Sequence, residues 1–99
     1  MVIVEISIIP IGTKSTSLSS FVAKAVGILK KKKVKHQLSS MGTIIEAENW
    51  EQALSIAKEM HESAFKEGAA RVVTNIKIDD RRDRKASISQ KMKSVEEKI

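Results

Sequence analysis

Two stretches of the chain alternate strictly between two faces, as β-strands do. In residues 2–9, one set of alternate positions is wholly apolar, and the other mixes Ile3 and Ile9 with Glu5 and Ser7. Residues 71–79 alternate in the same way and are rich in β-branched side chains, which favour strands. Pro10 and Gly12 are typical of a strand end, so the first strand is predicted to stop at residue 9.

Two other stretches repeat apolar residues at helical spacing. The first covers residues 18–29, and its N-cap is expected in the Ser/Thr run 15–17. The second begins after Asn49, which is expected to cap it together with Gln52, and it ends before Gly68. The predicted apolar stripes are Leu18, Phe21, Val22, Ala25, Ile28 and Leu29 in the first helix, and Trp50, Ala53, Leu54, Ala57, Met60, Ala64 and Phe65 in the second.

Shorter signals complete the order of elements. Residues 34–39 and 42–47 are predicted to be two strands of a hairpin that turns at "SSMG", and a weaker helix is predicted over residues 87–98. The order strand, helix, strand, strand, helix, strand is that of the ferredoxin-like βαββαβ sandwich, an α+β fold. We therefore expect one domain over residues 1–99, with an antiparallel four-stranded sheet, two helices on one face and a C-terminal helix.

The two main helices can cover only one face of such a sheet. The other face is predicted to carry Glu5, Ser7, Asn75, Lys77 and Asp79 mixed with Ile3, Ile9 and Val73. This mixture is too apolar for bare water and too polar for a core, so it favours either a partner subunit or a ligand.

Composition narrows the possible functions. The chain has no cysteine, which excludes disulfides and thiolate sites and makes a reducing cytoplasm the default location. No apolar run approaches the ~20 residues that cross a bilayer. The net charge of +6 leaves nucleic acid open as a partner, but the chain has only three aromatic residues to stack on bases. Much of the positive charge lies in Lys30 to Lys33, where it complements the dipole at a helix end or, alternatively, forms a phosphate-binding patch.

No sequence motif of an enzyme or a metal site is present. There is no phosphate-binding glycine loop, no HExxH and no nucleophile elbow. His36 and His61 lie on different elements, and each is more typical of a hydrogen-bonded structural histidine than of a base or a ligand. Trp50, at the first position of its helix, is expected to pack at the edge between helix and sheet. We therefore expect neither catalysis nor a bound metal or cofactor.

The stretch "KIDDRRDRK", residues 77–85, carries a dense cluster of charges. The three aspartates and three arginines of residues 79–84 sum to zero, which argues against a nucleic-acid contact made by unopposed arginines. Arginine and carboxylate pair in a planar, bidentate way that fixes orientation. The cluster therefore predicts a solvated turn after the strand, a clasp between subunits, or a direct contact with a ligand.

Five segments together resemble the small thiamine-binding protein family of archaea and bacteria. They are "VEISIIPIG" (4–12), "TSLSSFVAKAV" (16–26), "MGTIIEAE" (41–48), "MHESAFKEGAARVVTNIKIDDRRD" (60–83) and "KMKSVEEKI" (91–99). The resemblance covers nearly the whole chain in order. It implies a ferredoxin-like fold, association through the sheets into dimers and commonly tetramers, and binding of thiamine or its hydroxymethylpyrimidine portion without conversion.

Thiamine has a cationic thiazolium ring and a flat aminopyrimidine, so its site needs an apolar slot, a few hydrogen-bonding groups and a negative charge. For this ligand the candidate residues are Ser7, Thr43 and Asn75 as hydrogen-bonding groups, with Glu5 and Glu46 as counter-charge. Ile3, Ile9, Ile45 and Val73 are candidates for the slot. Thr43 and Ile45 differ from Glu46 in strand parity, so these residues cannot all lie on one face. The alternative function is a basic nucleic-acid-associated or regulatory module.

Overall fold

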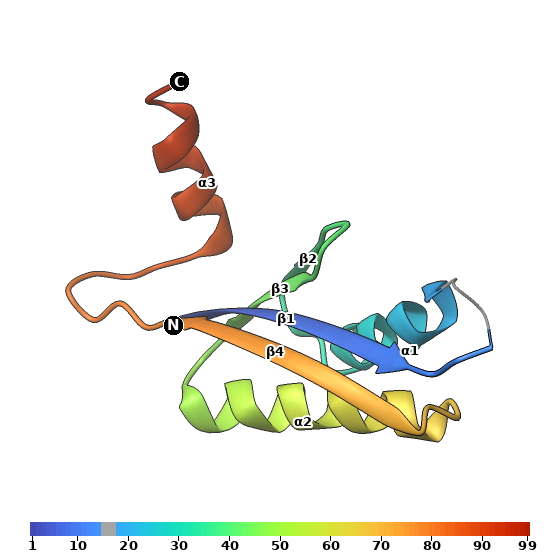
Figure 1. The fold of residues 1–99 in the computed structure, drawn as a ribbon. Helices are drawn as coiled ribbons and strands as arrows, with labels where there is room; N and C mark the ends of the chain where they lie inside the picture. Colours follow the sequence, from blue (N-terminus) through green and yellow to red (C-terminus); the bar gives the residue numbers. More distant parts are fainter. Residues whose placement is uncertain (15–17) are drawn as a thin grey trace.

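The chain folds into one sheet with two helices packed on one of its faces (Figure 1). The computed structural model describes residues 1–14 and 18–99. The elements within this part are β1 (Val2–Ile11), α1 (Ser19–Lys31), β2 (His36–Leu38), β3 (Thr43–Ala47), α2 (Trp50–Lys66), β4 (Arg71–Asp79) and α3 (Ile88–Glu96).

The sheet has the strand order β2-β3-β1-β4, and every neighbouring pair is antiparallel. With α1 and α2 on one face, this is the ferredoxin-like α+β sandwich, as predicted from the sequence. The third helix is also confirmed, and it stands away from the sheet on the face opposite α1 and α2 (Figure 1).

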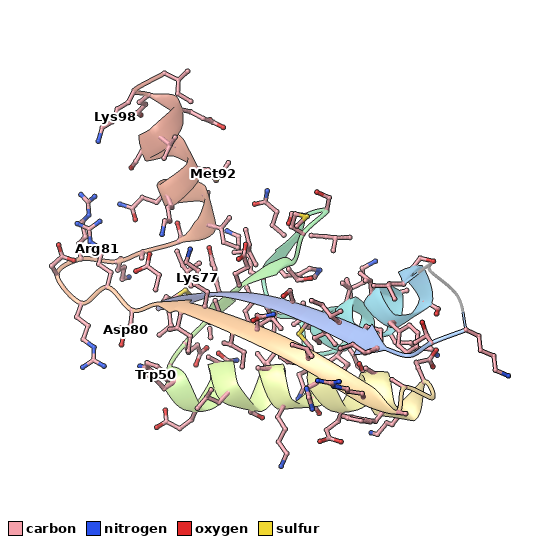
Figure 2. The ribbon with its side chains drawn as sticks, in the orientation of Figure 1. Trp50, Lys77, Asp80, Arg81, Met92 and Lys98 are labelled. Atoms are coloured by element: carbon pink, nitrogen blue, oxygen red, sulfur yellow. The ribbon has the colours of Figure 1, made fainter. Side chains whose placement is uncertain are left out.

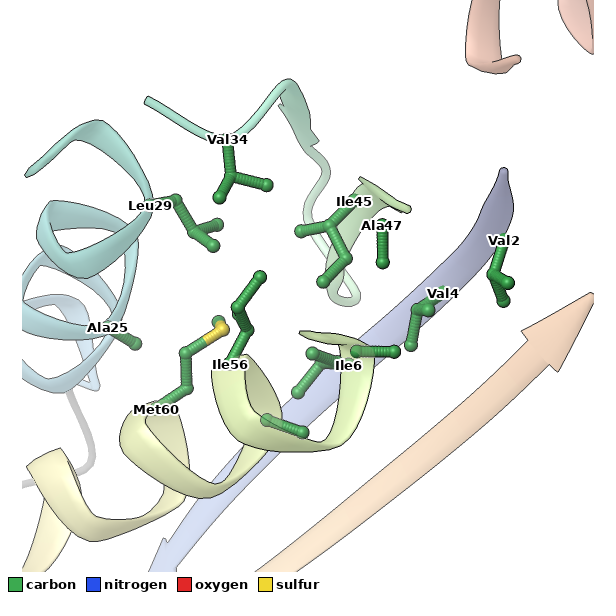
Figure 3. Close-up of a cluster of buried hydrophobic side chains, with 12 residues drawn as sticks. Val2, Val4, Ile6, Ala25, Leu29, Val34, Ile45, Ala47, Ile56 and Met60 are labelled. Carbon is green, nitrogen blue, oxygen red and sulfur yellow. The ribbon is translucent and has the colours of Figure 1, made fainter. Parts of the chain in front are cut away.

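The core lies between the sheet and the two helices (Figure 3). Val4 and Ile6 of β1 and Ile45 of β3 are almost fully buried because alternate positions of a strand point to the same face. They meet apolar residues of the helices, chiefly Leu29, Ile56 and Met60. The candidate slot residue Ile45 therefore belongs to the core and does not reach the open face.

β1 runs two residues further than predicted, through Pro10 to Ile11. Pro10 pairs with Val72 of β4, whereas the pairing of β1 with β3 stops at Ile6. A strand paired on one side tolerates a proline whose missing N–H would not have met a partner. The prediction that Pro10 ends the strand was wrong for this reason.

The predicted capping of α2 is confirmed. The side chain of Asn49 accepts the Gln52 N–H at 2.8 Å, and Gln52 Oε1 in turn accepts the backbone N–H of Glu48 at 2.6 Å. Gly68 follows the helix with a φ of 105°, the left-handed conformation that glycine adopts without strain.

The predicted stripe of α2 was partly wrong. Trp50, Leu54 and Phe65 remain 40–48% exposed, and the buried position that the stripe omitted is Ile56. α2 lies beneath β1 and the edge strand β4, so one flank of the helix extends past the sheet (Figure 1). The three exposed residues are apolar without being part of the core.

The N-cap that was expected for α1 in the run 15–17 lies outside the described residues. The residue before α1 is Leu18, which makes no side-chain capping bond.

The link from α1 to β2 also differs from the prediction. After the helix, Lys33 adopts a left-handed φ of 57°, and the backbone N–H of Val34 donates to the carbonyl of Leu29. Val34 is thus used in closing the helix and filling the core, so β2 begins at His36 rather than at residue 34.

Candidate functional site

Four of the five predicted site residues lie on the open face of the sheet, and three of them are neighbours. In the register of β1 with β4, Ser7 lies opposite Asn75 and Glu5 lies opposite Lys77. Directly opposed residues of antiparallel strands point to the same face, with Cβ atoms ~4.5–5.5 Å apart. Glu5, Ser7 and Asn75 therefore form one contiguous polar group on this face.

Glu46 lies on the same face but has another partner. It pairs with Ile3 in the register of β1 and β3, and only 8% of it is exposed. Its Oε1 accepts the backbone N–H of Ile88, the first residue of α3, at 2.5 Å. A salt bridge between Lys91 and Asp79 holds the same helix to β4. Glu46 thus anchors α3, and this contact occupies the carboxylate that was a candidate counter-charge.

Thr43 points to the opposite face, as its parity with Glu46 requires. It is 5% exposed and lies opposite Ile6, on the side that the helices cover. It does not join Glu5 and Asn75 on the open face. It lines a cavity that opens next to them.

This cavity of about 490 Å³ lies beside the start of β3, where β1 continues past Ile6 without a partner on that side. β1 forms one wall of the cavity, α1 forms another, and the hairpin between β2 and β3 closes it. The hollow exists because β3 does not pair with β1 beyond Ile6. Ser7 and Thr43 contribute hydroxyl groups to its lining. The apolar part of the lining comes chiefly from Ile8, Ile9, Leu18, Phe21, Val22, Leu38, Met41 and Met60.

Gly42 brings the rim of the cavity against the open face. A Cβ atom built at Gly42 would lie 3.5 Å from Glu5 Cγ and 3.7 Å from Ser7 Cβ. Both side chains are therefore packed beside the hairpin that lines the cavity. The apolar cavity, the hydroxyl groups of Ser7 and Thr43 and the carboxylate of Glu5 therefore lie close together beside β1.

The backbone of β1 adds hydrogen-bonding groups to the same place. Along a strand the N–H and C=O groups point to alternate sides, so alternate residues of 7–10 direct theirs to the side that β3 leaves unpaired, where Pro10, which has no N–H, can offer only its carbonyl. A strand edge of this kind offers a donor and an acceptor side by side to any ligand that carries the matching pair.

Sequence reasoning missed Phe21 and Gly42 as site residues. Phe21 was assigned to the packing stripe of the first helix, because the helical period cannot distinguish a core position from a cavity wall. Gly42 belongs to the predicted turn "SSMG", and its closeness to Glu5 depends on the register of β3 with β1. The local sequence predicts where β3 begins, but it has no signal for that register, which leaves β1 unpaired beyond Ile6.

The charge cluster of residues 79–84 forms contacts within the chain. Asp80 Oδ2 accepts bonds from Trp50 Nε1 at 3.0 Å and from Arg82 Nη2 at 2.9 Å, at the end of β4 (Figure 2). Arg81 binds Asp83 through two bonds of 2.6 and 2.9 Å. The hydrogen bonds from Arg82 and then Trp50 lower the pKa of Asp80, and the bond from Arg81 lowers the pKa of Asp83.

This cluster lies far from the cavity. Asp79, its first residue, pairs with Ile3, whereas the cavity begins at Ser7, four residues or roughly 13 Å further along β1. The hydrogen bonds of Asp80 and Asp83 are those of an ordered turn. The bond between Asp80 and Trp50 fixes the start of α2 to the end of β4.

The remaining polar candidates have partners as well. His61 Nδ1 lies 2.6 Å from Thr74 Oγ1, and His36 Nδ1 lies 2.7 Å from the carbonyl of Val34, which confirms that both histidines are hydrogen-bonded. Among residues 1–14 and 18–99, no group of three or more His, Cys, Asp or Glu side chains is placed to hold a metal ion. In the same residues, no helix is both long and apolar enough to span a membrane.

The sequence matches the profile of a protein family described as "Thiamine-binding protein" over residues 4–96. It is 48% identical to a UPF0045 protein of Methanothermobacter thermautotrophicus, with all of both chains covered. It is also 42% identical to the UPF0045 protein YqgV of Bacillus subtilis, covering 96% of this chain and 94% of that one.

Solved structures share the fold. A hypothetical protein of Methanocaldococcus jannaschii superposes with a TM-score of 0.87 at 38% identity, covering 97% of this chain and 96% of that one. A Thermotoga maritima protein proposed to act in thiamine biosynthesis or salvage superposes with a TM-score of 0.78, covering 95% and 97%. Because the second is 20% identical, that comparison supports the fold alone.

Proposed function

The chain belongs to the thiamine-binding protein family, and from that premise we propose that it binds thiamine, or the hydroxymethylpyrimidine portion of thiamine, without converting it. The observation that carries the proposal is the cavity beside the start of β3. Its volume of about 490 Å³ lies within the range usual for small-molecule sites, ~300–1,000 Å³.

The aminopyrimidine ring fits the apolar part of this cavity. The ring is flat and uncharged, and Phe21, Ile9 and Met60 supply apolar and aromatic surface around it. Its amino group and the neighbouring ring nitrogen form a donor and acceptor pair. The edge of β1 and the hydroxyls of Ser7 and Thr43 offer the complementary groups.

The thiazolium ring requires a negative charge, and Glu5 is the carboxylate placed to supply it. Its side chain packs beside Gly42 at the rim of the cavity, on the open face. Lys77 lies directly opposite Glu5 on β4 and opposes this attraction. Asn75, next to Ser7 across the strands, is a hydrogen-bonding group on the same face.

We further propose that the protein acts as a homo-oligomer that stacks through the open sheet faces. Ile9, Ile11 and Val73 on this face are 38–42% exposed, which is apolar surface that a second sheet would cover. Stacked sheets lie ~10 Å apart, so a partner would also cover the rim of the cavity at Glu5.

Titration calorimetry tests the binding proposal directly. We expect saturable heat with thiamine and with hydroxymethylpyrimidine at one site per chain. A Phe21→Ala variant should weaken both ligands, whereas Phe65→Ala, an aromatic truncation on the outer flank of α2, should leave both unchanged. No heat and no thermal shift with either compound at millimolar concentration would refute the proposed function.

A further inference from the structure

A second cavity, the α3 cavity, lies between α3 and the loop that connects β4 to it. Its volume is about 370 Å³, within the range usual for small-molecule sites, ~300–1,000 Å³. Where it meets the sheet it is lined by Ile3 and Asp79, which lie opposite each other in the register of β1 and β4. Within the described part of the chain, no residue lines both this cavity and the one beside Ser7, so the two are separate sites.

The lining of the α3 cavity is strongly positive. Among the described residues, five cationic side chains and one carboxylate line it, which gives a net charge of +4. The carboxylate belongs to Asp79 and already pairs with Lys91. Figure 2 shows Arg81 and Lys98, two of the five cations, on the same side of α3. The five are Arg81, Arg84 and Lys85 of the loop and Lys91 and Lys98 of the C-terminal segment.

The charges of the cluster after β4 balance along the chain but separate in space. Asp80 accepts the indole N–H of Trp50, on the side of the loop that contacts α2. Asp83 accepts two bonds from Arg81. Neither aspartate lines the α3 cavity, whereas Arg84 does. The balance of charge in the sequence therefore does not hold at this cavity, where the cations outnumber the carboxylates.

The α3 cavity is lined by hydrogen-bond donors that are available to a ligand. Within residues 1–14 and 18–99, the side chains of Arg84, Lys85 and Lys98 form no hydrogen bond and no salt bridge. The hydroxyl of Ser87 accepts the backbone N–H of Gln90 at 3.0 Å, and its own O–H remains to donate. Grouped cations repel one another, and a bound anion relieves that repulsion.

We propose that the α3 cavity binds a small anion that carries a phosphate or diphosphate group. The oxygens of such a group accept hydrogen bonds from lysines and hydroxyls and, in a bidentate way, from a guanidinium such as that of Arg84. The bound anion connects the loop to α3, because both contribute donors. No aromatic side chain of the described residues lines the cavity to stack on a base, so a small anion fits it better than a nucleic acid.

Calorimetry with inorganic diphosphate at constant ionic strength tests the site. We expect saturable binding at one site per chain. Arg84→Gln and Lys98→Gln should each weaken it about fivefold or more, because hydrogen bonds between charged groups are the strong ones. Arg82→Gln and Lys93→Gln are the matched controls, since Arg82 pairs with Asp80 and Lys93 lies on the other flank of α3. Each control removes the same charge and should weaken binding less than about twofold.

Two results of this experiment would refute the proposal. One is the absence of heat with diphosphate at millimolar concentration. The other is equal weakening by the control variants, because the attraction would then come from the overall positive charge of the protein rather than from this cavity.

Thiamine diphosphate distinguishes two sources of the anion, and this comparison rests on the proposed function. If the diphosphate belongs to the ligand of the cavity beside Ser7, thiamine diphosphate binds more tightly than thiamine, and Arg84→Gln removes the difference. If it is a separate molecule, inorganic diphosphate binds to protein that is saturated with thiamine. Either result supports the site. A failure of thiamine to bind refutes the proposed function and does not change the test with inorganic diphosphate.

Amide hydrogen exchange locates the anion in the unmodified protein. Because the anion connects the loop to α3, diphosphate should slow exchange over residues 88–96 and leave β1 unchanged. Chloride at the same ionic strength should slow neither. Diphosphate that binds without protecting α3 would overturn the assignment to this cavity.

Discussion

The carboxylate of Glu46 and the backbone N–H of Ile88 are 42 residues apart in the chain and 2.5 Å apart in space. This contact ties the start of the C-terminal helix to the end of β3. α3 has nine residues, and a helix of that length is marginal in water without tertiary contacts. Its position depends on this bond, on the Lys91–Asp79 pair and on the burial of Ile88.

Glu46→Ala should therefore release α3 selectively. Losing the partner of a buried N–H costs ~1–3 kcal/mol, and α3 can avoid that cost by detaching from the sheet. We expect faster amide hydrogen exchange over residues 88–96 and unchanged protection of β1 in the core. Glu48→Ala, an exposed carboxylate two residues away, is the control. Equal protection of α3 in Glu46→Ala and wild type would contradict this role.

Acid should break the contact between Asp80 and Trp50. Because the pKa of Asp80 is lowered from 3.8 in the folded protein, its stabilising contacts are present above that value and are lost as the pH falls through the lowered pKa. Trp50 is the one tryptophan in the sequence, so its emission reports this step. We expect a change in fluorescence with a midpoint below pH 3.8.

Two variants check the assignment of that acid transition. Asp80→Asn should abolish it, because the amide does not titrate. Asp83→Asn should keep it, because Asp83 binds Arg81 rather than the indole. A midpoint that stays in place in Asp80→Asn would show that another group causes the change.

Glu5 and Lys77 should affect thiamine binding in opposite directions. Glu5 lies beside Gly42 at the rim of the cavity and Lys77 lies opposite Glu5 on β4, so Glu5→Gln should weaken the cationic ligand and Lys77→Gln should strengthen it. Exposed charge pairs contribute ~0.2–1 kcal/mol, so each change in affinity should be about 1.4- to fivefold. Neutral hydroxymethylpyrimidine should bind both variants like wild type, and Glu51→Gln, on the far side of the sheet, should change neither ligand. The same loss for both ligands in Glu5→Gln would contradict a charge effect.

The fold was predictable because its signals are local. Alternation in β1 and β4, the Asn49 cap and the turn at "SSMG" each depend on neighbouring residues, and together they give the ferredoxin-like order. The alternation within β1 and β4 also predicts that Glu5, Ser7 and Asn75 share one face, and the register of the two strands confirms it.

The candidate site was less predictable because it depends on where elements stop. β3 begins opposite Ile6 while β1 continues past that point, and this difference creates the cavity that Thr43 and Phe21 line. Glu46 has the parity of a ligand residue, yet a helix 42 residues later occupies its carboxylate. Such distant partners leave no signal in the sequence around either residue.

Stability measurements can test which residues of α2 face the core. The sequence pattern includes Leu54 and omits Ile56, whereas the structure exposes 48% of Leu54 and only 2% of Ile56. Truncating a buried isoleucine removes burial energy and leaves a cavity, so Ile56→Ala should lower the free energy of unfolding by ~2–5 kcal/mol. Leu54→Ala should cost less than ~1 kcal/mol in a dilute sample, where copies do not associate. Urea denaturation of both variants decides between the two phases. Equal losses would show that Leu54 packs in the core.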